Sequence, residues 1–265
     1  MGTWVAIEAS ATDERSMLHG VEQAFTAIAS VDRLMHPERD NSDLARINRA
    51  AAGSAVRVDP WTFAALSICQ QLHQLSEGLF DPAVPSGGGS IADLVLAAPC
   101  SVALNRPLHL DLGGIAKGFA VDRAIDALMT AGCLAGVVNA GGDLRVFGPK
   151  PQRVLIRGDQ NRLHSIQLCN QALAVSNPEA ADHPPEYLGC YARSNDPARI
   201  SGAIAVAAAS AALADGLGKP LRFLGGPQAA RLLEKCGAGT VAWWSERCAV
   251  SYPGRVCPLP RTTYL

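Results

Sequence analysis

The sequence has 265 residues, of which 48% are hydrophobic and 18% are charged, and its formal net charge at pH 7 is -1. Such a chain can build a substantial core, as one domain or as two entwined halves, and it lacks the low hydrophobicity of disordered proteins. A net charge near zero gives no general attraction to nucleic acid or to an anionic membrane.

No segment approaches the ~18 unbroken apolar residues that a membrane span requires. The first residues, MGTWVAIEAS, contain neither a basic leader nor a lipid-attachment cysteine. We therefore expect a chain with no membrane span, no nucleic-acid partner and a cytoplasmic location.

Hydrophobic spacing predicts a strand and two helices at the start of the chain. TWVAIEA, residues 3–9, is typical of a strand, and apolar residues then recur at steps of three and four from Leu18 to Met35. This period indicates an amphipathic helix, which Pro37 ends. SDLARIN is predicted as a short helix with Ser42 as its N-cap.

The middle of the chain is predicted to contain two further helices and an intervening strand. Asp59 and Pro60 are suited to the N-cap and first position of a helix that ends near Gly78. SGGGS, residues 86–90, has the composition of a flexible loop. The strand LHLDL, residues 108–112, is expected to lead into a helix over residues 115–131.

The remainder of the chain is predicted to be rich in strands. GVVNA and DLRVF, joined by two glycines, indicate a β-hairpin. Further strands, a short helical or looped segment at LADGLGKPL, one more helix at PQAARLLEKCG and a closing hairpin follow. Strands and helices do not alternate as a doubly wound sheet requires, so we predict an α+β fold with helices packed on mainly antiparallel sheets.

The stretch LDLGGIAKGFAVDR, residues 110–123, joins the predicted strand to a helix through two glycines. Glycines allow backbone to approach a ligand closely, and a helix N-terminus offers free N–H groups to a phosphate. Asp111 and Lys117 flank this junction, and a plain turn with a solvated lysine is the alternative. By the period of two along a strand, His109 would share a face with Asp111.

Three other short motifs carry carboxylates. NAGGDLRV ends a predicted strand on a second glycine pair, and Asp143 after it is interpreted as a turn residue. GLFDP, residues 78–82, is either a helix C-cap followed by an Asp-Pro turn or a ligand loop. Asp215 in LADGLGKP has apolar surroundings, so its carboxylate needs a cation, backbone donors or water as a partner.

The order of these motifs resembles that of the ApbE family of FAD:protein FMN transferases, over roughly residues 1–250. The matching stretches are MGT, SDLARIN, SEGLFDP, LDLGGIAKGFAVDRA, VNAGGDLR and ASAALADGLGKPLRFLG. The resemblance implies cleavage of FAD at its pyrophosphate and transfer of FMN to a Thr or Ser hydroxyl of an acceptor protein, with AMP leaving and Mg²⁺ assisting. Some relatives instead hydrolyse FAD to FMN and AMP.

The resemblance also implies roles for individual residues. Positions that would contact FAD are Met1, Leu79, Phe80, Asp81, Asp111 and Lys117. Asp215 and the backbone carbonyl of Gly114 would hold Mg²⁺.

Two departures from the family pattern leave alternatives open. Lys219 stands where the family usually has a metal-binding Thr, so its ammonium would oppose a metal, replace it, or simply be solvated. RSNDPARISG keeps Asp196 and Pro197 of a family segment but lacks its His and its Thr-Gly. The alternatives to transfer are therefore FAD binding with weak or lost catalysis, and FAD pyrophosphatase activity.

Overall fold

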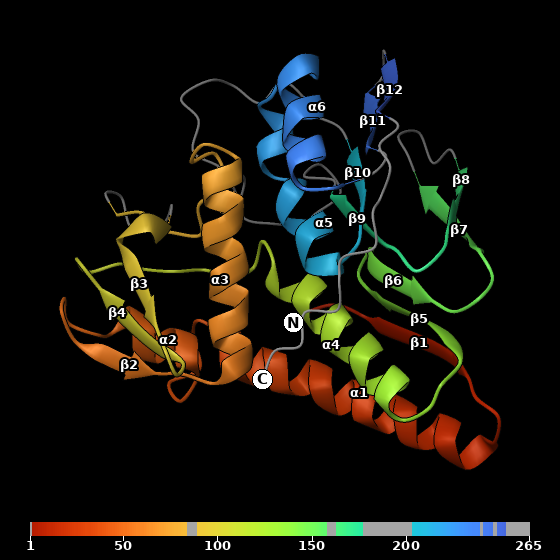
Figure 1. Ribbon diagram of the computed structural model, residues 1–265, viewed down its shortest axis with the longest axis horizontal. Helices are drawn as coiled ribbons and strands as arrows, with labels where there is room; N and C mark the ends of the chain where they lie inside the picture. Colours follow the sequence, from red (N-terminus) through yellow and green to blue (C-terminus); the bar gives the residue numbers. More distant parts are fainter. Residues whose placement is uncertain are drawn as a thin grey trace.

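A seven-stranded sheet lies at the centre of the fold, and all of its neighbouring strands that are paired in register are antiparallel (Figure 1). The structure is a computed structural model that describes residues 2–83, 89–157, 163–176, 203–238, 241–245 and 248–252. In spatial order the strands are β1 (Val5–Ser10), β5 (Ala135–Ala140), β6 (Asp143–Phe147), β9 (Ala172–Ser176), β10 (Ala203–Ala208), β11 (Val241–Ser245) and β12 (Cys248–Tyr252).

Two smaller antiparallel sheets accompany the central one. The first has the order β2 (Ala55–Arg57), β4 (Ser101–Leu104), β3 (Leu94–Ala97), and the second is the hairpin of β7 (Gln152–Arg157) and β8 (Leu163–Leu168). In Figure 1 they lie on opposite sides of the molecule, with α3, α5 and α6 between the three-stranded sheet and the central sheet.

Two of the helices begin at N-caps that the sequence predicts. The Ser42 side chain accepts a hydrogen bond from the Ala45 N–H, and the Asp59 side chain accepts one from Trp61, which confirms both predicted N-caps. The α-helices are α1 (Glu14–Met35), α2 (Asp43–Asn48), α3 (Pro60–Leu75), α4 (Ala116–Thr130), α5 (Ala211–Leu217) and α6 (Gly226–Lys235), and the 3₁₀ turns are η2 (Ile91–Asp93) and η6 (Pro220–Arg222).

Strand β10 is apolar throughout because both faces of the sheet are covered at this strand. Ile204, Val206 and Ala208 belong to the main core, which includes residues of α1, α3, α4 and α5. Ala203, Ala205 and Ala207 instead pack with Ile156 of β7 and Leu168 of β8. Alternate residues of one strand thus stabilise two separate apolar layers.

The structure confirms the predicted α+β class and corrects one predicted strand. Residues 108–112 form no strand, because their backbone is paired with a side chain and a loop instead of a sheet neighbour. The Asn48 side-chain amide donates to the Leu110 carbonyl at 2.9 Å and accepts from its N–H at 2.8 Å. The premise that strand alternation places His109 beside Asp111 is therefore wrong.

Strands β3 and β4 were not predicted, and their sequence, LVLAAPCSVAL, has few polar residues to mark an alternation. Residues 84–88 lie outside the described residues, so the predicted loop over residues 86–90 stays a prediction apart from Gly89 and Ser90. The organisation as one domain likewise stays a prediction. Among the described residues, no helix combines the length and the apolar character needed to cross a membrane.

Candidate active site

Four charged side chains from three parts of the chain meet in one cluster. The Lys117 ammonium donates to Asp143 Oδ2 at 2.5 Å and lies 3.5 Å from Asp215 Oδ2. The Lys219 ammonium pairs with Asp215 Oδ1 and also donates to the Asp215 backbone carbonyl, at 2.9 Å. These residues are called the charge cluster below, and its charges alternate in the order Asp143, Lys117, Asp215, Lys219.

The two carboxylates form the buried layer of the charge cluster and the two lysines the more exposed layer. The side chains of Asp143 and Asp215 are 3% and 2% exposed, whereas those of Lys117 and Lys219 are 33% and 17% exposed. Buried carboxylates stay charged only with partners. The two lysine side chains are therefore the members of the charge cluster that an incoming anion would meet first.

The pKa values of the two acids in the charge cluster shift in opposite directions. Burial and the neighbouring charge of Asp215 raise the pKa of Asp143 to about 6, in spite of the attraction of Lys117. Burial also opposes the charge of Asp215, but Lys117 and Lys219 together lower the pKa of Asp215. For Lys117, burial disfavours the ammonium, yet the attraction of Asp215 and Asp143 prevails and raises its pKa.

A close contact between α4 and α5 brings Lys117 to Asp215. A Cβ atom added at Gly118 would lie 2.2 Å from the Ala211 carbonyl oxygen, so only glycine permits this approach. The Gly118 N–H in turn points at Asp215 Oδ2, at 3.5 Å. The glycine that the site requires for close packing is therefore Gly118, one residue after Lys117.

The start of α5 is fixed by a buried acid of α4. Asp122 accepts hydrogen bonds from the N–H groups of Ala211 and Ala212, both at 2.9 Å, and from the Arg145 guanidinium at 2.8 Å. Because Asp215 lies one turn further along α5, these bonds also set its position.

The glycine pair before Asp143 makes the tight turn that was predicted. Gly141 and Gly142 have φ values of +64° and +100°, and the Gly142 N–H donates to the Asn139 side chain at 3.0 Å. A Cβ at Gly141 would lie 2.3 Å from Thr3 Oγ1, so the N-terminal segment packs on this turn. Met1 itself lies outside the described residues.

Phe80 and Asp81, which the resemblance assigns to FAD contact, are fully buried. Asp81 Oδ1 accepts from the Ala83 N–H at 2.9 Å and from the Ile91 N–H at 3.0 Å, which ties the Asp-Pro turn to η2. Leu79 is half-buried. In this arrangement a ligand contact from the loop would come from Leu79 or from backbone.

Asp111 lies beside that loop and outside the charge cluster. Its N–H donates to the Pro82 carbonyl at 3.0 Å, and its Oδ1 accepts from the Gly113 N–H at 2.8 Å. The chain then continues through Gly114, which is buried, into the first turn of α4 with Lys117. The structure thus connects Asp111 to Lys117 through one short turn, and Lys117 to Asp215 by direct contact.

The side chains do not form a site for a divalent metal in this arrangement. Both oxygens of Asp215 already face lysine ammonium groups, and its carbonyl accepts from Lys219. Among the described residues, no three His, Cys, Asp or Glu side chains are grouped as metal ligands. Like unit charges about 4 Å apart repel by about 1–4 kcal/mol at effective dielectric constants of 80 to 20, and a divalent ion beside Lys219 would experience more.

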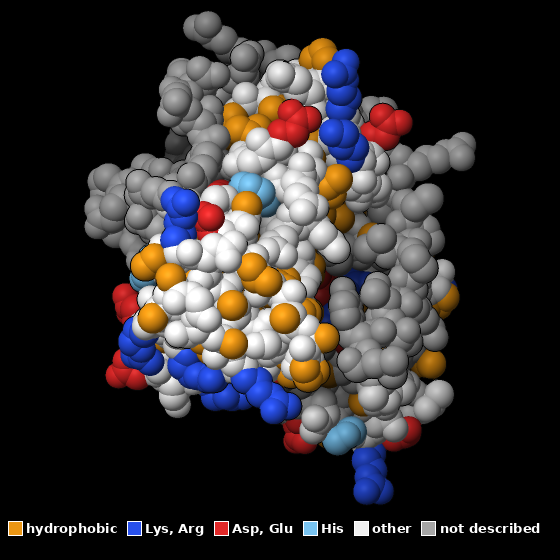
Figure 2. Space-filling model, turned by 60° about the vertical axis from the view of Figure 1, so that its left-hand side comes forward, with side chains coloured by type: hydrophobic (Ala, Val, Ile, Leu, Met, Phe, Trp, Pro, Cys, Tyr) orange, Lys and Arg blue, Asp and Glu red, His pale blue; other side chains and the backbone are white. Residues whose placement is uncertain are grey.

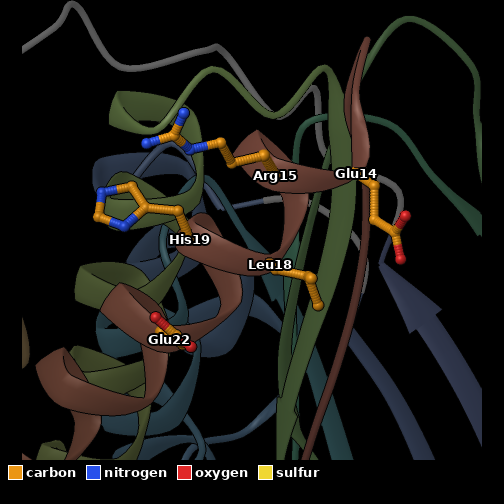
Figure 3. A pocket seen from close by; sticks show the side chains of 5 residues that line it. All are labelled: Glu14, Arg15, Leu18, His19 and Glu22. Atoms are coloured by element: carbon orange, nitrogen blue, oxygen red, sulfur yellow. The ribbon is translucent and has the colours of Figure 1, made fainter.

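A pocket elsewhere on the described surface is separate from the charge cluster. A hollow on α1 is lined by Glu14, Arg15, Leu18, His19 and Glu22, all from one helix and none from the predicted site (Figure 3). On the face shown in Figure 2, hydrophobic side chains are scattered and Lys and Arg side chains gather along the lower edge.

With this geometry in place, comparison with known proteins identifies the family. The model of the ApbE family matches residues 1–95 and 90–243. The chain belongs to the ApbE family. The motif order that indicated this family in the sequence is thereby confirmed.

Two curated relatives and a solved structure show the range of similarity within the ApbE family. A FAD:protein FMN transferase of Rhodobacter capsulatus is 32% identical over 52% of this chain and 34% of its own length. One of Treponema pallidum is 26% identical over 49% of this chain and 44% of its own length. The chain thus spans about a third to a half of the length of the curated relatives it matches.

The solved flavin transferase ApbE of Vibrio cholerae superimposes with a TM-score of 0.77 and 20% identity, covering 96% of this chain and 94% of that one. This likeness extends over nearly the whole chain and supports the ApbE fold.

Sequence reasoning missed Asp143 as a partner of Lys117. Asp143 was interpreted as a turn residue, although a carboxylate directly after a strained Gly-Gly turn was the available signal. Lys219 was singled out from the sequence with its role left open, and the structure shows that its spacing of four from Asp215 places both residues on one side of a helical turn.

Proposed function

We propose that this chain transfers FMN from FAD to a Thr or Ser hydroxyl of an acceptor protein and releases AMP. Membership of the ApbE family supports this reaction, because the curated relatives bear the name FAD:protein FMN transferase. The observation that carries the proposal is the layer of two ammonium groups, Lys117 and Lys219, above two buried carboxylates. A diphosphate bridge is an anion that such a layer can bind.

The start of α4 adds to this anion site. Ile115, the N-cap residue, provides no side-chain hydrogen bond to the first turn, in which Lys117 lies. The Ala116 N–H already donates to the Leu112 carbonyl and the Gly118 N–H to Asp215, so this turn offers a phosphate mainly the positive end of the helix dipole. We place the diphosphate of FAD between this turn and the two ammonium groups, with Asp111 and Leu79 on the side toward the flavin or the adenine.

In the proposed reaction the acceptor oxygen attacks the FMN phosphorus and forms a phosphate ester. The bond between this phosphorus and the bridging oxygen breaks, AMP leaves with that oxygen, and the hydroxyl proton is released. Lys117 and Lys219 stabilise the charge that moves onto the departing phosphate. No covalent intermediate with the enzyme is required.

Magnesium is the part of the expected chemistry that the observed side chains support least. Asp215 and the Gly114 carbonyl would be its ligands by family resemblance, but Lys219 occupies the oxygens of Asp215. The proposed step above therefore uses only the residues of this chain. A cytoplasmic location also remains a prediction.

The test is to incubate the purified chain with FAD and candidate acceptor proteins and to search for an FMN adduct by mass spectrometry. Lys117→Met should abolish the adduct, whereas Lys235→Met, on the exposed end of α6, should leave it unchanged. Failure to form any adduct over several acceptors would count against transfer.

The same samples separate the two alternative functions. AMP and free FMN without an acceptor would indicate FAD pyrophosphatase activity. Bound FAD with no AMP would indicate a binding protein. The Lys219–Asp215 contact favours this outcome over pyrophosphatase activity in the case that turnover requires a metal on Asp215.

A further inference from the structure

Lys219 lies at the point of the charge cluster where a cation would bind. Its ammonium contacts two oxygens of Asp215, one from the carboxylate and one from the backbone carbonyl. A carboxylate and a carbonyl oxygen are ligands typical of a hard cation such as Mg²⁺. An ammonium on the same two oxygens satisfies them with a single fixed charge.

Local geometry fixes this ammonium in place. Gly218 and Lys219 continue the helical backbone beyond α5, with φ and ψ of −55° and −25° and of −78° and −60°, so Lys219 lies one turn after Asp215. The Lys219 N–H donates to the Gly216 carbonyl at 3.4 Å. A positive charge beside the last carbonyl groups of a helix also interacts favourably with the helix dipole.

A second contact holds the same turn against the sheet. The Arg222 guanidinium donates to the Ser176 carbonyl at 2.8 Å, which connects η6 to the end of β9. A Cβ at Gly218 would lie 3.8 Å from the Ser176 Cβ. The residues before and after Lys219 therefore both lie against Ser176, and the Lys219 side chain is 17% exposed.

We infer that Lys219 is a resident cation that replaces a divalent metal on Asp215, so that this chain binds the diphosphate of its nucleotide through Lys117 and Lys219 without metal. This inference rests on the proposed function for the identity of the nucleotide, but not for the state of Asp215. Lysine is suited to this role because it binds phosphate as a point charge.

The first experiment tests Asp215 directly and involves no nucleotide. Mn²⁺, which takes the oxygen ligands of Mg²⁺, is titrated into wild type, Lys219→Thr and Lys235→Thr, and free Mn²⁺ is followed by its paramagnetic resonance signal. Wild type and Lys235→Thr should bind no Mn²⁺, whereas Lys219→Thr should bind one ion, which Asp215→Asn in the same background removes. Binding to wild type that Asp215→Asn removes would overturn the inference, and so would a folded Lys219→Thr protein that binds none.

The second experiment measures FAD affinity calorimetrically in Mg²⁺ and in chelator. The wild-type affinity should be the same in both, and Lys219→Thr should lose about tenfold to a hundredfold in chelator, as expected for one hydrogen bond to a charged group, and recover with Mg²⁺. Wild-type binding that depends on Mg²⁺ would refute the inference. Absence of FAD binding under every condition would refute the proposed function instead, while the Mn²⁺ titration still decides the state of Asp215.

Discussion

Lys117 and Asp143 lie 26 positions apart in the chain, yet the lysine ammonium and the aspartate Oδ2 are 2.5 Å apart. The contact joins the first turn of α4 to the first residue of β6. Asp143 directly follows the tight turn of Gly141 and Gly142, and the packing at Gly118 brings the same lysine to Asp215 on α5. The contact therefore connects the helical layer of the molecule to its central sheet.

Replacing Lys117 by Met should lower the free energy of unfolding by about 2 kcal/mol, since two buried carboxylates would lose their shared cation. The loss should be smaller than for a fully buried pair, because the lysine side chain is 33% exposed. Asp143→Asn should cost less, since it leaves no unpaired anion. Urea unfolding of both single variants and the double variant gives the coupling, and independent, additive effects would contradict the contact.

The pH dependence of stability should carry the signature of Asp143. The pKa of this acid is raised to about 6 in the folded protein from its ordinary value of 3.8. The folded state therefore binds more protons than the unfolded state between these values, and the contribution of Asp143 to stability is lost as pH rises through about 6.

Urea midpoints measured between pH 4 and pH 7 on wild type and Asp143→Asn should reveal this difference, because the variant keeps only the decline that other acids with a raised pKa, such as Asp126, contribute. Parallel profiles of the two proteins would show that Asp143 has no raised pKa. Asp215 acts in the opposite direction, since its lowered pKa gives stability that is lost as pH falls toward acid values.

Sequence reasoning recovered the helices and most strands because their signals are local. Caps such as Ser42 and Asp59 act within three residues, and hydrophobic period acts within one element. Residues 108–112 were predicted as a strand because alternation cannot reveal that Asn48, 62 positions away, takes the backbone hydrogen bonds of Leu110. The site followed the same rule: Asp215 and Lys117 were found from motifs, whereas their contact depends on how α4 meets α5.

A substitution at Gly118 tests directly how α4 packs against α5. Gly118→Ala places a Cβ 2.2 Å from the Ala211 oxygen and 2.7 Å from the Ala212 nitrogen, so α5 must move away from α4. We expect a loss of about 1–3 kcal/mol or more and weaker FAD binding, because Asp215 moves with α5.

Gly237→Ala is the control, since its Cβ would meet nothing within 4 Å and only its φ of +56° is unfavourable. That strain costs about 1–2 kcal/mol and leaves the site intact. If both variants bound FAD equally well, the packing at Gly118 would have no role in placing Asp215.

Asp122 tests whether the position of α5 is set from its first turn. Asp122→Ala leaves the N–H groups of Ala211 and Ala212 and the Arg145 guanidinium without their shared acceptor, in a place where the acid is only 3% exposed. Each unsatisfied buried donor costs about 1–3 kcal/mol, so we expect the free energy of unfolding to fall by at least the upper end of that range in chemical denaturation.

Asp126→Ala is the control, since it removes a carboxylate from the same helix. The pair of Asp126 with Arg123 is a half-exposed contact, so this variant should change stability by no more than about 0.5 kcal/mol. Hydrogen exchange should accelerate at the α5 amides in Asp122→Ala and stay unchanged in Asp126→Ala. Equal exchange in the two variants would mean that α5, and with it Asp215, is held in place by packing alone.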